Sequence, residues 1–197
     1  MYRKLIYLFF SIILFISFSS KLLANPSDFI KMLTSDASKI LASNISKDQK
    51  MIELIKLAEQ NVDIKGIGMY TLGKHRKNLS ENQIEEYEIL FNKYFLKSFS
   101  SRLSEYTDPK INVLSEEKIN DKYTIVSSVL EEDEKRPEIK IDWRVYTINP
   151  DKPLVRDLII EGLSLARTQR EEFNSVIQNG DGKIEILFFN LKKFIEN

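Results

Sequence analysis

The stretch "EIKIDWRVYTI", residues 138–148, alternates apolar and polar side chains along its length. Ile141, Trp143 and Val145 fall on one face of an extended chain, and Asp142 and Arg144 fall on the other. Successive side chains of a strand point to opposite faces, so one face should meet an apolar layer and the other should meet water. The stretch therefore predicts a strand of an antiparallel sheet.

Three more segments have strand character. Residues 110–114, 122–130 and 154–160 are alternating or continuously apolar, and polar turns separate them. Earlier segments follow the helical period from about residues 27, 46, 64 and 80, and two more helices are expected at 168–178 and from 184. We therefore predict one α+β domain with an antiparallel twisted sheet of about four strands packed against helices.

The N-terminus has the plan of a secretory signal peptide. Arg3 and Lys4 precede an apolar run over residues 5–18, roughly 14 residues and short of the ~20 that a spanning helix needs. We expect cleavage after Ala24, so that residues 1–24 are removed and residues 25–197 form the exported domain. The alternative is an uncleaved membrane anchor. The sequence has no cysteine, so we expect no disulfide framework.

The net charge of the sequence does not indicate nucleic acid as a partner. Without residues 1–24 the chain keeps 26 basic and 29 acidic residues, a formal charge of about −3. Nucleic-acid binding needs a clustered basic excess, which this balance does not supply.

The motifs of catalysis are incomplete. "GLSLA", residues 162–166, comes close to a nucleophile elbow, but a hydrolase of that type needs an acid and then a histidine after the serine, and His75 precedes Ser164. No metal-ligand spacing accompanies that single histidine. We therefore predict no enzyme, no catalytic residue, no metal site and no cofactor; the alternative is a hydrolase with Ser164 as nucleophile.

An apolar surplus remains. A predicted helix carries five aromatic side chains along one stripe, in addition to the apolar face of the sheet: Tyr87, Phe91, Tyr94, Phe95 and Phe99. These layers could fill one core, which would suit a non-catalytic interaction module. They could also leave an apolar cavity for a lipid or another hydrophobic ligand.

Four motifs together favour the second reading. They are D-x8-L-G at 63–73, S-x-x-Q-x3-Y-x3-F at 80–91, W-x-V-Y at 143–146 and V-x-D-x3-E-G-x-S-L-x4-R-x-E-F at 155–173. In this combination the chain resembles the MlaC family, also called the toluene-tolerance family, over nearly the whole exported domain.

The resemblance implies a monomeric periplasmic carrier of phospholipid. It would move lipid between an inner-membrane ABC transport complex with an MCE-type subunit and an outer-membrane lipoprotein complex, and so maintain outer-membrane lipid asymmetry. The acyl chains would enter the apolar space between sheet and helices, and the hydroxyl of Ser164 would bond to nearby backbone. The side chains expected to line this cavity are Ile67, Tyr70, Phe91, Ile125, Val129, Ile141, Trp143, Val145, Leu158, Ile160, Leu163 and Phe173.

A basic run supports one further hypothesis. Lys74, His75, Arg76 and Lys77 are consecutive near a predicted helix end. They could meet an acidic partner surface or lipid headgroups, and the alternative is an ordinary solvated helix terminus.

Overall fold

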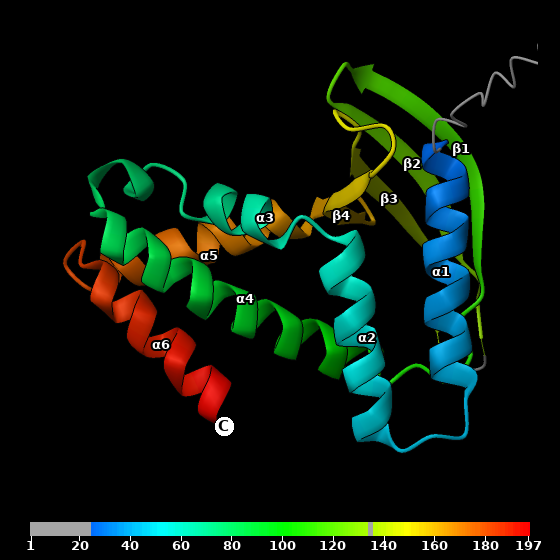
Figure 1. Cartoon of the computed structure of the whole chain (residues 1–197), viewed down its shortest axis with the longest axis horizontal. Helices are drawn as coiled ribbons and strands as arrows, with labels where there is room; N and C mark the ends of the chain where they lie inside the picture. The colour runs from blue at the N-terminus through cyan, green and yellow to red at the C-terminus, as the bar shows by residue number, and fades with distance from the viewer. Residues whose placement is uncertain (1–24, 134–135) are drawn as a thin grey trace, which may run out of the picture.

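The computed structural model describes residues 25–133 and 136–197, so the predicted signal peptide at 1–24 lies outside the described residues. Helices precede a sheet, and two more helices follow it (Figure 1). This is the predicted α+β class. The helices are α1 Pro26–Ala42, α2 Lys47–Asn61, α3 Ile64–Thr71, the 3-10 helix η1 His75–Asn78, α4 Glu81–Leu103, α5 Leu165–Asn179 and α6 Ile184–Glu196. The strands are β1 Ile111–Asn120, β2 Tyr123–Leu130, β3 Ile139–Tyr146, β4 Leu154–Ile160 and β5 Leu163–Ser164.

Local sequence explains where the helices begin. Ser46 and Ser80 each form a complete capping box with the glutamine three residues later, Gln49 and Gln83. Each serine accepts a bond from a free backbone N–H of the first turn, which fixes the helix start. α5 begins at Leu165, earlier than the predicted residue 168, because Ser164 caps it.

The sheet is antiparallel in the order β1-β2-β3-β4-β5. Strands β2, β3 and β4 match the predicted segments closely. β1 continues to Asn120 rather than ending at Leu114, and β5 was not predicted. The outer half of β1 is exposed and carries charged side chains such as Glu117, so no apolar alternation marks it in the sequence.

The register defines two faces of the sheet. Trp143 pairs with Val126 on one side and with Leu158 on the other, so these three side chains share a face. A β-bulge on β4, between the pairs Val145–Val155 and Arg144–Asp157, allows Arg156 and Asp157 to point to the same side.

Two hydrophobic cores result. The sheet core joins α1 to the first face of the sheet through Phe29, Ile30, Leu33, Val126, Val145 and Val155. The helical core is formed by α2 to α6, with α4 packed against α2, α3 and α6. Within it, the hydroxyl of Tyr87 shares a hydrogen bond of 2.7 Å with Thr71 Oγ1, and burial raises the pKa of Tyr87, so this phenol stays protonated.

The two cores meet beside α2. Leu57 of α2 packs against the sheet core, whereas Ala58 belongs to the helical core, and Val62 packs against both. The Asp63 N–H donates to the Val155 carbonyl at 2.9 Å, which fixes the start of α3 to β4. In Figure 1, α2 accordingly stands between the sheet with α1 and the group α3 to α6.

No helix among the described residues is both long enough and apolar enough to cross a membrane.

Candidate functional site

The helical side of the candidate site is a row of phenylalanines on α4. Phe91, Phe95 and Phe99 follow one another at four-residue spacing and so lie on one face of the helix. Phe91 points at α3, because a methyl group placed on Gly68 would lie 2.7 Å from its Cδ1 atom. Phe95 and Phe99 lie further along and are stacked at a centroid distance of 5.8 Å. Both are only partly buried where they pack against the helical core.

The sheet side consists of two cross-strand pairs. Ile141 pairs with Ile160 and Trp143 pairs with Leu158, all on the face that α1 covers elsewhere. Trp143, Leu158 and Ile160 are partly buried. The indole N–H of Trp143 donates to Ser128 Oγ at 2.8 Å, so its polar atom is satisfied and its ring can contact hydrocarbon.

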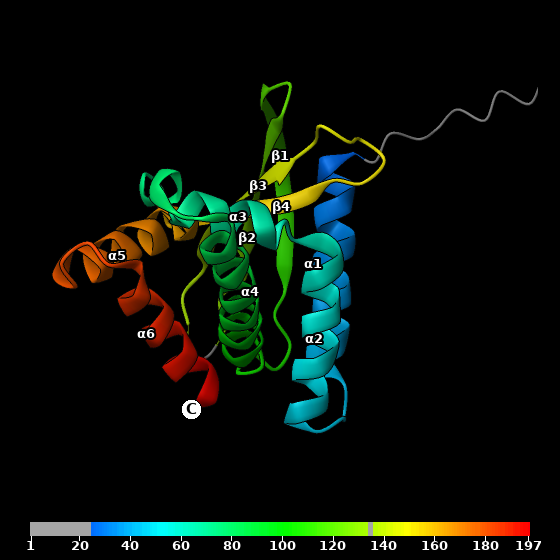
Figure 2. The same ribbon diagram turned by 60° about the vertical axis from the view of Figure 1, so that its left-hand side comes forward.

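Helix α2 links these two sets of side chains. α1 and Leu57 of α2 pack against the first face, and α4 packs against α2. Figure 2 shows the same grouping, with α4 between the α1–α2 pair and the α5–α6 pair. We give these two sets of apolar side chains one name, the apolar seam; its members are Phe95, Phe99, Ile141, Trp143, Leu158 and Ile160. Its side chains offer contact to hydrocarbon, and they hold no nucleophile, acid or base.

The structure distributes the twelve predicted side chains over several places. Four of them lie on the seam, namely Ile141, Trp143, Leu158 and Ile160. Ile125 and Val129 lie on the opposite face, because they pair with Arg144 and Lys140. Ile67, Phe91 and Phe173 are buried in the helical core and Val145 in the sheet core, whereas Tyr70 and Leu163 are exposed.

Phe95 and Phe99 are the seam side chains that the prediction did not include. Their spacing from Phe91 was the available signal, because a residue four positions later lies on the same helical face. What the spacing could not show is that Phe95 and Phe99 are only partly buried.

A family model described as "MlaC protein" matches residues 29–193. The chain belongs to the MlaC family. The family similarity that the four motifs predicted is therefore confirmed over residues 29–193. Comparison with curated proteins gave no match.

A solved structure has the same fold as this MlaC protein. It is the phospholipid-binding protein from Ralstonia solanacearum, determined in complex with a phospholipid. The two chains are 17% identical and superpose with a TM-score of 0.73, over 88% of this chain and 98% of the other. At this identity the likeness shows a shared fold.

The MlaC motif residues Asp157 and Ser164 hold the start of α5 against the sheet. Ser164 Oγ donates to Asp157 Oδ2 at 2.6 Å and accepts from the Arg167 N–H at 3.1 Å. The Ala166 N–H donates to Asp157 Oδ1 at 3.0 Å. The predicted bond from Ser164 to local backbone is therefore present, and the serine acts as a helix cap.

The lone histidine lies elsewhere in this MlaC fold. His75 Nε2 and Asn174 Oδ1 are hydrogen-bonded at 2.9 Å. Asn174 lies in the second half of α5, away from Ser164, which caps the start of that helix. Among the described residues, no group of three or more histidine, cysteine, aspartate or glutamate side chains is placed to hold a metal ion.

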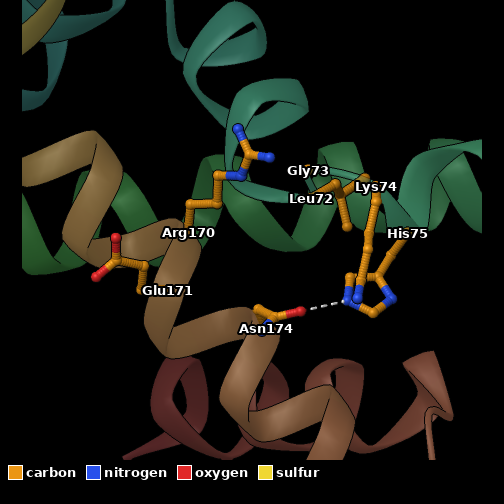
Figure 3. Close-up of a pocket in the computed structure, with 7 residues that line it drawn as sticks. All are labelled: Leu72, Gly73, Lys74, His75, Arg170, Glu171 and Asn174. Atoms are coloured by element: carbon orange, nitrogen blue, oxygen red, sulfur yellow. Dashed lines mark hydrogen bonds between the residues drawn. The ribbon is translucent and has the colours of Figure 1, made fainter.

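Two pockets lie at the η1 end of the molecule. The larger, of about 290 Å³, is shown in Figure 3 and is lined by Leu72, Gly73, Lys74, His75, Arg170, Glu171 and Asn174. The second, of about 200 Å³, also borders His75. None of the twelve predicted lipid-contacting side chains lines either pocket.

Proposed function

We propose that this protein is a periplasmic phospholipid carrier, and that the acyl chains of the bound phospholipid lie in the apolar seam. The observation that carries the proposal is the division of the interior into two cores, each with partly buried apolar side chains packed against it. A chain that needed only to be stable would gain by closing that boundary completely. Support also comes from family membership and from the phospholipid bound by the Ralstonia protein of the same fold.

In this proposal, the carrier exchanges lipid between an inner-membrane ABC transport complex with an MCE-type subunit and an outer-membrane lipoprotein complex. Residues 1–24 direct export and are removed, residues 25–197 form the carrier, and it works as a monomer. The result is maintained asymmetry of outer-membrane lipids. The headgroup stays near solvent, because the seam side chains are apolar.

The energetics explain why such a carrier needs partners. Burying one methylene is worth about 0.8 kcal/mol, so a chain of roughly 14 buried methylenes is worth about 11 kcal/mol. Release of that chain into water would be very slow. Exchange between two apolar sites avoids this cost, and its direction follows from differential affinity or an ATP-driven partner. No step of this mechanism requires a catalytic residue.

The decisive experiment is mass spectrometry of lipid extracted from the exported protein after purification without detergent. We expect about one phospholipid per protein. Protein that is empty, and stays empty after incubation with phospholipid vesicles and its transport partners, would instead support an interaction module with a filled core.

The export step has its own test. The intact mass of protein recovered from the periplasm should correspond to a chain that begins at Asn25. A mass that includes residues 1–24 would show an uncleaved anchor.

A further inference from the structure

The end of α3 and η1 form an unusually basic segment. Residues 64–80 contain no aspartate or glutamate, and Lys74, His75, Arg76 and Lys77 are consecutive within them. Arg76 and Lys77 are exposed, as is Lys74. The structure adds a further cation from a distant part of the sequence, Arg170 of α5.

Arg170 lies against this segment in a defined orientation. Its guanidinium carbon is 5.1 Å from the centroid of the Tyr70 ring. A methyl group placed on Gly73 would lie 2.7 Å from Arg170 Nε, and Gly73 has a φ of 54°, so the absence of a side chain permits both the turn and the approach. Stacking on an aromatic ring orients a guanidinium before any ligand arrives.

Lys74, Arg170 and His75 line the larger pocket, which we call the basic pocket. The pairing of His75 with Asn174 fixes the imidazole at its edge. Glu171 is the acidic side chain of the lining, and in Figure 3 its carboxylate points away from Lys74 and His75. The apolar member, Leu72, is only 1% exposed, so the basic pocket presents polar groups to a partner.

Among residues 25–133 and 136–197, no acidic side chain forms a salt bridge with the cations of this surface. In the part of the chain that the structure describes, Lys74, Arg76, Lys77 and Arg170 take part in no salt bridge. By contrast, Lys65 at the start of the same helix pairs with Glu88 at 2.9 Å. We call Arg76 and Lys77, the exposed residues that follow the lining residue His75 in the chain, the rim. A concave site with an oriented guanidinium and such cations beside it is complementary to carboxylates.

We propose that the basic pocket, with Arg76 and Lys77 on its rim, is the docking surface for an acidic face of a lipid-exchange partner protein. A partner carboxylate enters between Lys74 and Arg170, and further acidic side chains meet the rim. This rests on the proposed function, because the partner is the protein that donates or accepts the lipid. A protein is favoured over a membrane surface, since a concave pocket fits a protruding carboxylate side chain and its one apolar lining residue, Leu72, is covered, so the pocket offers no apolar side chain to insert into a membrane.

The test compares two double charge reversals in the exported protein. Arg76→Glu with Lys77→Glu alters the rim, and Lys122→Glu with Lys152→Glu makes the same charge change at two exposed lysines of strand connections. Lipid content is measured first. Lipid transfer to the periplasmic domain of the MCE-type subunit is then followed at low and high salt, with vesicles of neutral and anionic phospholipid as further acceptors.

We expect the rim variant to keep its lipid and to transfer it about tenfold more slowly at low salt, because rim charges act mainly on the association rate. The difference should shrink at high salt, which screens charges beyond about 10 Å at 0.1 M ionic strength. Arg170→Gln, which alters the pocket itself, should slow transfer in the same salt-dependent way. The lysine control should behave like the parent.

Three results would overturn the docking proposal. They are a rim variant as fast as the parent, an equal loss in the lysine control, and a loss confined to transfer into anionic vesicles. A parent protein that carries no lipid would contradict the proposed function instead, so the two failures are distinguishable.

Discussion

Asp63 makes two contacts that together join a helix to the sheet. Its Oδ1 accepts from the Gly66 N–H at 2.8 Å and so caps α3. Its Oδ2 accepts from Arg156 Nε at 2.7 Å. Arg156 in turn donates to the Tyr123 hydroxyl at 2.7 Å and stacks 4.0 Å from the centroid of the Tyr146 ring. The motif aspartate is therefore a structural joint between the two halves of the molecule.

Replacement of Arg156 by methionine should destabilise this joint. The variant leaves the half-buried Asp63 carboxylate without its charged donor, and we expect the free energy of unfolding to fall by about 2 kcal/mol, the scale of a hydrogen bond to a charged group. Urea unfolding measures the change. Arg102→Met, at an exposed position of α4, should stay within about 0.5 kcal/mol of the parent. Equal stabilities of the two variants would contradict the role given to Arg156.

At the scale of elements, the register between β2, β3 and β4 decides on which face of the sheet each side chain lies. Ile125 and Ile160 are both isoleucines and both partly buried, but they lie on opposite faces of the sheet. Only Ile160 is on the seam. Val145, which is also on the seam's face, is 0% exposed within the sheet core, so a polar residue there would unfold the protein.

Ile160→Asp should therefore abolish lipid binding in a protein that still folds. A carboxylate on the seam loses its hydration when an acyl chain binds beside it, which is strongly unfavourable. Lipid content by mass spectrometry and folding by circular dichroism are the two measurements. The matched control is Ile125→Asp, which should retain its lipid. Loss of lipid in the control with retention in Ile160→Asp would place the lipid on the other face.

In the proposed carrier, the stacked pair Phe95 and Phe99 of α4 borders the bound acyl chains. Both rings are partly buried against the helical core, so in the proposed lipid site they should limit how far an acyl chain can extend. Phe99→Ala removes a ring from this boundary, and we expect the bound lipids to shift toward longer acyl chains. Lipid mass spectrometry reads the chain lengths directly. Phe189→Ala, at an exposed position of α6, should leave the acyl-chain lengths of the bound lipid unchanged. If neither variant changes these lengths, Phe99 does not lie at the boundary of the lipid site.

At the scale of the whole molecule, bound lipid should contribute to stability. The two cores are joined by α2, by Val62 and by the Asp63–Arg156 joint, and the seam between them is apolar. A ligand that binds only the folded state raises the free energy of unfolding by RT ln(1 + [L]/Kd), about 2.7 kcal/mol at a hundredfold excess over Kd.

The lipid-free protein should accordingly unfold at a lower urea concentration than the loaded protein. Addition of phospholipid to the lipid-free form should restore the midpoint. Circular dichroism during urea titration measures both. Identical midpoints for the two forms, at confirmed lipid contents, would show that the lipid does not bridge the cores.

The sequence by itself determined the family, most of the helices and three of the strands, β2, β3 and β4. The capping boxes at Ser46 and Ser80 and the alternation around Trp143 are local signals, because backbone hydrogen bonding and side-chain period depend on neighbours in the chain. The predicted end of β1 was wrong, because the outer part of this strand is exposed and has no apolar alternation. β5 was not predicted, because a strand of two residues is too short to show a pattern.

Only the tertiary structure decided which apolar side chains share a surface. Strand alternation separates the faces of one strand, but the register between strands and the bulge at Arg156 decide that Ile160 lies with Trp143 whereas Ile125 does not. The same is true of the basic pocket, in which Arg170 of α5 reaches Gly73 and Tyr70. Both depend on contacts between residues far apart in the chain, and no local pattern contains those contacts.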